Sequence, residues 1–235
     1  MKIAVAFTGL FKKASESSIK SLSSSIQKLK NDHEIDCYFY IKHPPSKCPE
    51  RIKKQIIEFF PDSFIKIYNT LEEDLSIKTP DACYHYTLSA FYQRYQWNQI
   101  WEIIKSTKKH YDFLIRTRPD FRFTNDPNLS EFNLWNDHND VLYGVSKLSP
   151  NRKDLLNIKA IQDVFTICNI KVAEILMTTI NRFHLLDRKD LKEKCYMYKN
   201  CKDLPECYSI YDLIKNNIET KVIEELHSEY QWTIR

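Results

Sequence analysis

The sequence predicts a single α/β domain in which a mostly parallel central sheet is flanked by helices, with mixed strands in the C-terminal half. Apolar strand patterns alternate with helical patterns in the first half of the chain, which is typical of parallel sheets with right-handed crossovers. No Pro/Gly/Ser-rich linker divides the 235 residues. A hydrophobic content of 43% is enough for one sizeable core.

The first half of the chain is expected to supply the parallel strands. Short apolar runs predict strands over residues 2–9, 34–42 and 63–68. Apolar residues at helical spacing predict helices over 15–30 and 50–59, between those strands.

A long helix is predicted over residues 86–107, because aromatic residues occupy much of its circumference. A helix that is apolar almost all round is buried on several sides. Buried polar groups need partners, so the polar residues of this helix bind either neighbouring loops or a ligand. These residues are Gln93, Arg94, Gln96 and Asn98.

The second half of the chain is expected to be less regular. Its patterns predict a short helix, a strand, a polar and basic loop and a helix, at residues 129–134, 140–145, 146–160 and 170–183. Residues 161–168 run into the last of these helices. A further helix is expected over 206–217.

Composition excludes several classes of function. The net charge of +4, from 35 basic and 31 acidic residues, is too mild to predict a nucleic-acid partner. The chain has only two glycines, Gly9 and Gly144, and glycine-rich nucleotide loops need closely spaced ones. A bound nucleotide must therefore be held by side chains, a cation or a helix N-terminus.

The cysteines and the apolar runs predict the cellular setting. Seven cysteines without the spacing of a disulfide scaffold indicate reduced thiols, so we expect a cytoplasmic protein. Residues 3–11 are a first strand and not a signal peptide, because no small-residue cleavage site follows them. No apolar run reaches the ~18 residues of a membrane span.

Residues 111–123 are the most informative segment. A buried-strand pattern runs directly into four charged residues, Arg116, Arg118, Asp120 and Arg122. Pro119 ends the regular ladder, because proline has no N–H and a fixed φ. In open α/β sheets, ligands bind at the C-terminal ends of the strands. Arginines suit phosphate oxygens, and a carboxylate suits Mg²⁺ or Mn²⁺. The alternative is a surface strand end with an Arg–Asp ion pair.

The Arg-x-Arg-Pro-Asp sequence of residues 116–120 resembles the central motif of GT-A type nucleotide-sugar glycosyltransferases, in particular the small transferases of bacteria and large DNA viruses. Three weaker segments add to the resemblance. Residues 3–9 resemble the first strand and its small-residue turn, 162–165 resemble an Asp-Gln-Phe-like segment, and 227–229 resemble a Pro-Glu pair. Together these segments span most of the chain, and only the central one is specific.

The resemblance implies a single GT-A-like (Rossmann-like) domain over residues 1–235, with a nucleotide-binding half (1–124) and an acceptor-side half (125–235). It implies transfer of a hexosyl or deoxyhexosyl group from a nucleotide-sugar to a hydroxyl of a glycan or glycoconjugate. The alternative is a non-catalytic nucleotide- or glycan-binding module with the same fold. A metal-dependent phosphate-ester enzyme would need more clustered carboxylates than this sequence offers.

The resemblance also implies site residues. Those expected to bind the donor diphosphate are Thr8, Gly9, Lys12, Arg94, Gln96, Arg116, Arg118 and Arg122. Asp120 and His227 would hold Mn²⁺ or Mg²⁺, and Asp120 is also a catalytic candidate. Asp163, placed at a strand-to-helix turn, is the candidate base, with a helix N-cap as its alternative role.

This chain departs from the family pattern at three positions. The usual Asp-x-Asp is replaced by Asp120-Phe121-Arg122, which leaves metal dependence open. Lys12 stands where an arginine is often found, and Ser228 replaces the proline of the Pro-Glu pair.

Overall fold

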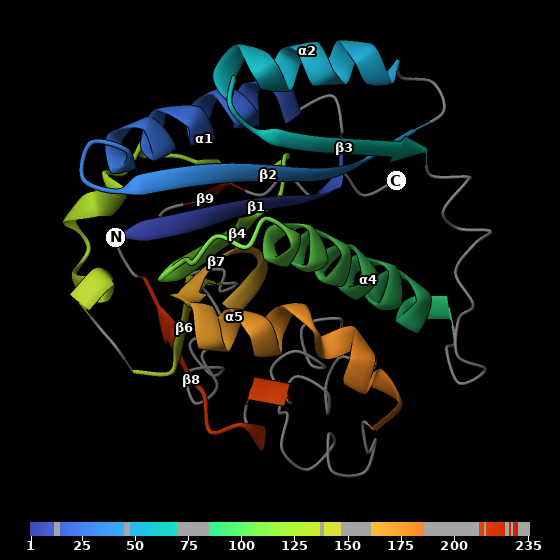
Figure 1. Cartoon of the computed structure of the whole chain (residues 1–235), viewed down its shortest axis with the longest axis vertical. Helices are drawn as coiled ribbons and strands as arrows, with labels where there is room; N and C mark the ends of the chain where they lie inside the picture. Colours follow the sequence, from blue (N-terminus) through green and yellow to red (C-terminus); the bar gives the residue numbers. More distant parts are fainter. Residues whose placement is uncertain are drawn as a thin grey trace.

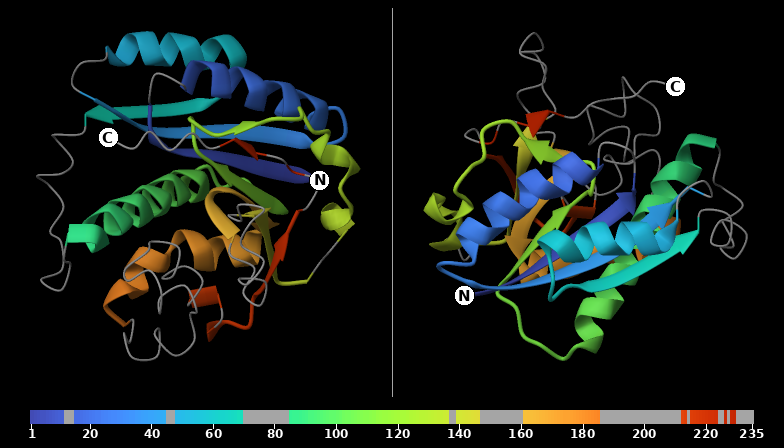
Figure 2. Two further views of the ribbon diagram at one scale, coloured as in Figure 1. Left: turned by 180° about the vertical axis from the view of Figure 1, so that it is seen from behind. Right: turned by 90° about the horizontal axis from the view of Figure 1, so that it is seen from above.

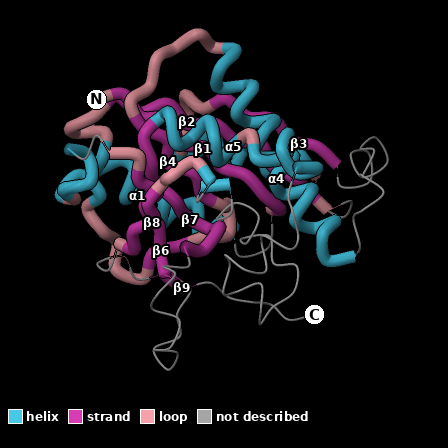
Figure 3. Tube along the Cα trace, turned by 90° about the horizontal axis from the view of Figure 1, so that it is seen from below, coloured by secondary structure: helices cyan, strands magenta, loops and turns pink. Residues whose placement is uncertain are grey.

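The computed structural model describes residues 1–11, 15–44, 48–69, 85–136, 139–146, 161–185, 212–213, 215–223, 226 and 228–229. The strands are β1 (Lys2–Leu10), β2 (Glu34–His43), β3 (Phe64–Asn69), β4 (Phe113–Thr117), β5 (Arg122–Phe123), β6 (Val141–Ser146), β7 (Ile161–Asn169), β8 (Glu219–Val222) and β9 (Ser228–Glu229). The α-helices are α1 (Ser15–Leu29), α2 (Pro49–Phe59), α4 (His85–Ser106) and α5 (Ile170–Met177). Three 3₁₀ helices are η1 (Leu129–Glu131), η2 (Asn133–Asn136) and η4 (Thr179–Leu185). Figure 3 traces these elements along the chain.

In the described part of the chain, the strands form a seven-stranded sheet with the order β3-β2-β1-β4-β7-β6-β8 (Figure 1). Neighbouring strands are parallel except at β7, which is antiparallel to both β4 and β6. The short strands β5 and β9 form a separate antiparallel pair. The predicted fold class, a mostly parallel sheet with mixed strands in the second half, is confirmed.

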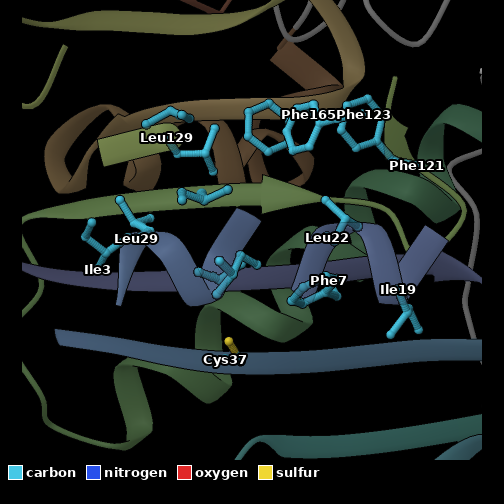
Figure 4. Close-up of a cluster of buried hydrophobic side chains, with 14 of the residues drawn as sticks. Ile3, Phe7, Ile19, Leu22, Leu29, Cys37, Phe121, Phe123, Leu129 and Phe165 are labelled. Carbon is cyan, nitrogen blue, oxygen red and sulfur yellow. The ribbon is translucent and has the colours of Figure 1, made fainter. Parts of the chain in front are cut away.

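Helices cover both faces of the sheet, with α1 and α2 on one face and α4 and α5 on the other (Figure 1 and Figure 2). We call these the α1 face and the α4 face. On the α1 face, Phe7 and its neighbours in β1 pack against the apolar side of α1 (Figure 4). That side consists of Ile19, Leu22, Ile26 and Leu29, whose spacing of three to four residues places them on one stripe of the helix.

The α4 face has a different kind of core. Strand β1 contributes two small side chains to this core, Ala4 and Ala6, which belong to the same cluster as the bulky Trp97 and Trp101 of α4. Small residues on the strand leave room for large aromatic side chains on the helix. Successive residues of a strand point to opposite faces, so each central strand serves both cores.

Several elements differ from their predicted bounds. Within residues 111–123, β4 begins at Phe113 and stops at Thr117, before Pro119 as expected, and residues 122–123 resume pairing as β5. The helix expected over 129–134 is two 3₁₀ turns, and the one expected over 170–183 continues beyond α5 as η4. Strand β8 was not predicted. Residues 147–160 and most of 206–217 lie outside the described residues.

The segment that follows β5 is tied to α1 through Asp126, a residue with φ +36°. Lys28 donates to the Asp126 carboxylate at 2.7 Å, and Ser24 and Ser25 donate to it at 3.3 Å each. These bonds fix the direction in which the chain leaves β5. None of the described helices is long and apolar enough to cross a membrane.

Candidate functional site

The order of the strands reverses between β1 and β4. From β1 the chain proceeds outward to β2 and β3 on one side, whereas β4 pairs with β1 on the other side (Figure 1). The C-terminal ends of the two strands at such a switch point border a crevice in open α/β sheets. The first strand and the Arg-x-Arg-Pro-Asp segment therefore meet where this architecture binds ligands.

Gly9 brings these two segments into contact. Its φ of +130° lies in a region that side chains with a Cβ rarely adopt. A Cβ built on Gly9 would lie 3.6 Å from Cδ of Pro119 and 3.9 Å from Cγ of Arg118. The absence of a side chain at Gly9, near the C-terminal end of β1, therefore allows the backbone to pass close to the turn formed by residues 118–120, which we call the motif turn.

The motif turn contains a bidentate ion pair. Arg118 donates from Nε and Nη2 to the two carboxylate oxygens of Asp120, at 2.9 and 3.0 Å. The side chains are 17% and 6% exposed, respectively. Because β4 ends at Thr117, strand alternation does not align Arg116 with this pair. The Arg–Asp ion pair considered as the alternative interpretation is thus present, in a partly buried form.

Aromatic residues anchor the chain just beyond the motif turn. Phe121 and Phe123 pack on Phe165 of β7, with ring centroids 5.2 and 5.1 Å from that of Phe165 (Figure 4). Arg122 lies between them in sequence and is half-buried, and in register it pairs with Glu229 of β9. The C-terminal segment that resembles a Pro-Glu pair therefore runs beside the arginine segment.

The second feature of the site is a pair of buried arginines stacked on one indole ring. Arg116 leaves β4 toward α4, and its Cζ lies 4.1 Å from the centre of the Trp97 ring. Arg94 of α4 lies 3.7 Å from the same ring centre. Each arginine is only 1% exposed. We call Arg94, Trp97 and Arg116 the Arg–Trp stack. The stack therefore brings two guanidinium groups to one buried ring.

Small residues flank Arg116 within the sheet. The register aligns Ala6 of β1, Arg116 of β4, Thr166 of β7 and Gly144 of β6 in one row across four strands. Thr8 follows Ala6 on the same face of β1. The hydroxyls of Thr8 and Thr166 are buried and have no hydrogen-bond partner among the described residues. Thr166 and Trp97 were not predicted as site residues.

Of the remaining predicted residues, Gln96 lies away from the Arg–Trp stack, and the other three have side chains outside the described structure. Gln96 is buried, but it precedes Trp97 and projects from α4 about 100° away, outside the Arg–Trp stack. Lys12 and His227 lie outside the described residues, and the structure describes Asp163 only through its backbone.

The local setting predicted for Asp163 was wrong. This residue lies within β7 and not at a strand-to-helix turn. The N-cap of α5 is Asn169, whose side chain accepts a hydrogen bond from the Val172 amide at 2.9 Å. Since Phe165 pairs with Thr117, the antiparallel register still brings the start of β7 to the C-terminal end of β4.

The described residues offer poor ligands for a divalent cation. No group of three His, Cys, Asp or Glu side chains among them is close enough to hold a metal ion. Both oxygens of the motif carboxylate, Asp120, already accept hydrogen bonds from Arg118. The cysteines in the described ranges, Cys37, Cys48 and Cys168, are free thiols. Burial raises the pKa of Cys37 to about 12 and also raises that of Cys168, so neither is a thiolate at neutral pH.

Comparison with known proteins identifies the fold. No protein-family model and no curated protein matches the sequence. Among solved structures, the apo form of the WbbM bifunctional glycosyltransferase superposes with a TM-score of 0.51 and 12% identity, over 94% of this chain and 38% of that one. This chain has a glycosyltransferase fold of the GT-A type. It spans less than two-fifths of the WbbM chain.

Two other glycosyltransferase structures are less similar. The galactosyltransferase LgtC, in complex with donor and acceptor sugar analogues, gives a TM-score of 0.44 and 12% identity over 94% of this chain and 73% of LgtC. A glycosyltransferase involved in glycosylation of the major capsid of PBCV-1 gives a TM-score of 0.44 and 10% identity over 94% of this chain and 80% of that one. The fold assignment relies on WbbM, and at these identities the comparisons define the fold and not the substrates.

Proposed function

We propose that this protein is a glycosyltransferase that moves a hexosyl or deoxyhexosyl group from a nucleotide-sugar to a hydroxyl of a glycan or glycoconjugate. The observation that supports this most is the position of the Arg–Trp stack. It lies beside the Arg-x-Arg-Pro-Asp turn, at the switch point of a glycosyltransferase fold. Buried arginines beside the C-terminal ends of parallel strands suit an anionic ligand with several oxygens.

The chemistry of sugar transfer explains why cations are needed there. The bond between the anomeric carbon and the β-phosphate oxygen breaks through an oxocarbenium-like state, and a nucleoside diphosphate leaves with that electron pair. Groups that stabilise the developing negative charge lower the barrier most when they are preorganised in a low-dielectric site. Arg94 and Arg116 are held in this way by Trp97, and Arg118 is held by Asp120.

Asp120 and Asp163 have different roles in this proposal. Asp120 positions the guanidinium of Arg118 through the bidentate pair and does not contact the acceptor. Asp163 is the proposed base that takes the proton of the attacking hydroxyl, if the enzyme inverts. The position of its backbone, at the end of the sheet where β4 ends, supports this proposal.

The proposed division of labour follows the two halves of the chain. Residues 1–124 supply β1, β4 and α4, and therefore most of the donor site. Residues 125–235 supply the acceptor side, together with Thr166 of β7, which lies next to Arg116 in the sheet.

A non-catalytic nucleotide- or glycan-binding module is the second candidate. It is favoured by the Asp120-Phe121-Arg122 sequence, which lacks the second carboxylate of Asp-x-Asp, and by the engagement of both Asp120 oxygens. Binding of a donor without turnover would distinguish this module from an enzyme.

A thermal-shift panel tests the proposal. The chain is heated with millimolar UDP, GDP, CDP or dTDP and with nucleotide-sugars, with and without Mn²⁺. A ligand that binds only the native state at 100 times its Kd stabilises it by about 2.7 kcal/mol. No shift with any diphosphate would refute a transferase. Hydrolysis of the stabilising donor, lost in Asp120→Asn with the fold retained, separates the enzyme from the binding module.

A further inference from the structure

We infer that the donor diphosphate is bound on the α4 face of the sheet, where Arg94 and Arg116 balance its charge, and that this binding requires no divalent cation. The inference rests on the proposed function and assigns the part that a metal ion usually plays to two buried side chains. Three features of the site support it.

The first feature is the state of the motif carboxylate. Asp120 is 6% exposed and accepts from two nitrogens of Arg118. Binding of Mg²⁺ or Mn²⁺ to Asp120 would require this bidentate pair to break, and the guanidinium beside it would repel the ion. Arg122 further replaces the second carboxylate with a positive charge.

The second feature is the geometry of the Arg–Trp stack. A guanidinium that stacks on an indole ring uses its flat face, so its N–H groups point outward in the plane of the group. Arg94 and Arg116 approach the ring from different elements, α4 and β4, and lie within 4.1 Å of its centre. Two arginines fixed in this way present planar donor groups that match the oxygens of a diphosphate.

The third feature is a pair of buried hydroxyls beside Arg116. Thr8 and Thr166 lie on the α4 face and have no hydrogen-bond partner among the described residues. A buried hydroxyl without a partner destabilises the native state, and a ligand oxygen would satisfy it. Thr117 also has a buried hydroxyl without a partner in the described structure, but alternation places it on the α1 face with Ile115. Thr117 is therefore a matched control.

The test is calorimetric titration of the full chain with UDP, GDP, CDP and dTDP, first with EDTA and then with Mn²⁺. We expect the Kd of the tightest binder to differ by less than about threefold between the two conditions, a difference below 1 kcal/mol. We expect Arg94→Gln and Arg116→Gln to weaken binding about 10- to 100-fold, as loss of a charged hydrogen bond does. Arg51→Gln, an exposed change on α2, should leave the Kd unchanged.

Isosteric threonine variants keep the test decisive if an arginine variant fails to fold. Thr8→Val, Thr166→Val and Thr117→Val each remove one buried hydroxyl, so none should lower the melting temperature. We expect Thr8→Val and Thr166→Val to weaken binding about 3- to 10-fold, and Thr117→Val to bind like wild type.

The outcomes separate the two proposals. If EDTA abolishes binding to the wild-type chain and Mn²⁺ restores it, this inference is overturned and the proposed function stands. Equal binding by all three valine variants would place the diphosphate away from the α4 face and would also overturn it. If no nucleoside diphosphate binds in either condition, the proposed function itself fails.

Discussion

The two faces of the central strands differ most at the end of the sheet where β1 and β4 terminate. On the α1 face, Phe7, Ile115 and Phe165 belong to an apolar core, in which Phe7 stacks on Phe39 at 4.1 Å between ring centroids. On the α4 face, the same strands carry Thr8, Arg116 and Thr166, all buried. Apolar packing explains why Phe7, Ile115 and Phe165 are buried. Burial of the polar groups of Thr8, Arg116 and Thr166 costs free energy, and in the proposed function a bound ligand offsets part of that cost.

The largest expected effect is a loss of stability on the α1 face. Phe165→Ala removes the ring on which Phe121 and Phe123 pack, so we expect the free energy of unfolding to fall by about 3–5 kcal/mol. Urea denaturation measures this change. Phe64→Ala, at an exposed position of β3, is the control and should change stability by less than about 0.5 kcal/mol. A similar small change for Phe165→Ala would break the comparison.

The α4 face should respond mainly through ligand binding. Arg116→Met removes a buried cation of the proposed donor site, so we expect nucleoside diphosphate binding to be lost, while the free energy of unfolding falls by less than it does in Phe165→Ala. As a control, Arg182→Met should destabilise by about 1–3 kcal/mol, because Asp212 then loses its hydrogen-bonded partner. Strong destabilisation by Arg116→Met would assign Arg116 to the fold.

A smaller effect is expected where β1 meets the motif turn. Gly9→Ala forces a residue with a Cβ to adopt a φ of +130°, at a cost of about 1–3 kcal/mol. The expected contacts with Pro119 and Arg118 are of ordinary length, so the cost comes from the backbone and not from a clash. Chemical denaturation together with donor titration checks this prediction. A variant as stable as wild type would show that the turn can adopt another conformation.

The smallest expected effect concerns the ion pair at the rim of the α1 face. Hydrogen bonds from Lys28, and then from Ser24 and Ser25, lower the pKa of Asp126 below its unfolded value of 3.8. This pairing therefore stabilises the fold above that value, and the contribution is lost as the pH falls through the lowered pKa. Asp126→Asn should cost about 0.2–1 kcal/mol at pH 7 and nothing at pH 2. An equal loss of stability at pH 7 and at pH 2 would show that the contribution of Asp126 is not ionic.

The sequence was sufficient for the features that depend on local patterns. Apolar spacing predicted β1, β2, β3 and the helices between them, and Pro119 correctly marked the end of β4. The small-residue turn expected at Gly9 is instead the last part of β1, which extends to Leu10.

Features that depend on pairing between distant segments could not be predicted. Thr166 lies beside Arg116 only because β7 inserts antiparallel next to β4, and strand order is not encoded in the local pattern. From the sequence alone, Trp97 is one of several aromatic residues expected in the core. Nothing in the helix sequence indicates that an arginine from β4 will stack on it. Asp163 was misplaced because β7 extends to Asn169, so the strand-to-helix boundary lies later than expected.

The most direct test of the account is a crystal structure of the chain with the nucleoside diphosphate that stabilises it most among UDP, GDP, CDP and dTDP. The account predicts the diphosphate at the C-terminal ends of β1 and β4, on the α4 face, with phosphate oxygens about 2.7–3.2 Å from donors of Arg94, Arg116 or Thr8. A diphosphate bound on the α1 face, or held through a metal ion on Asp120, would contradict it.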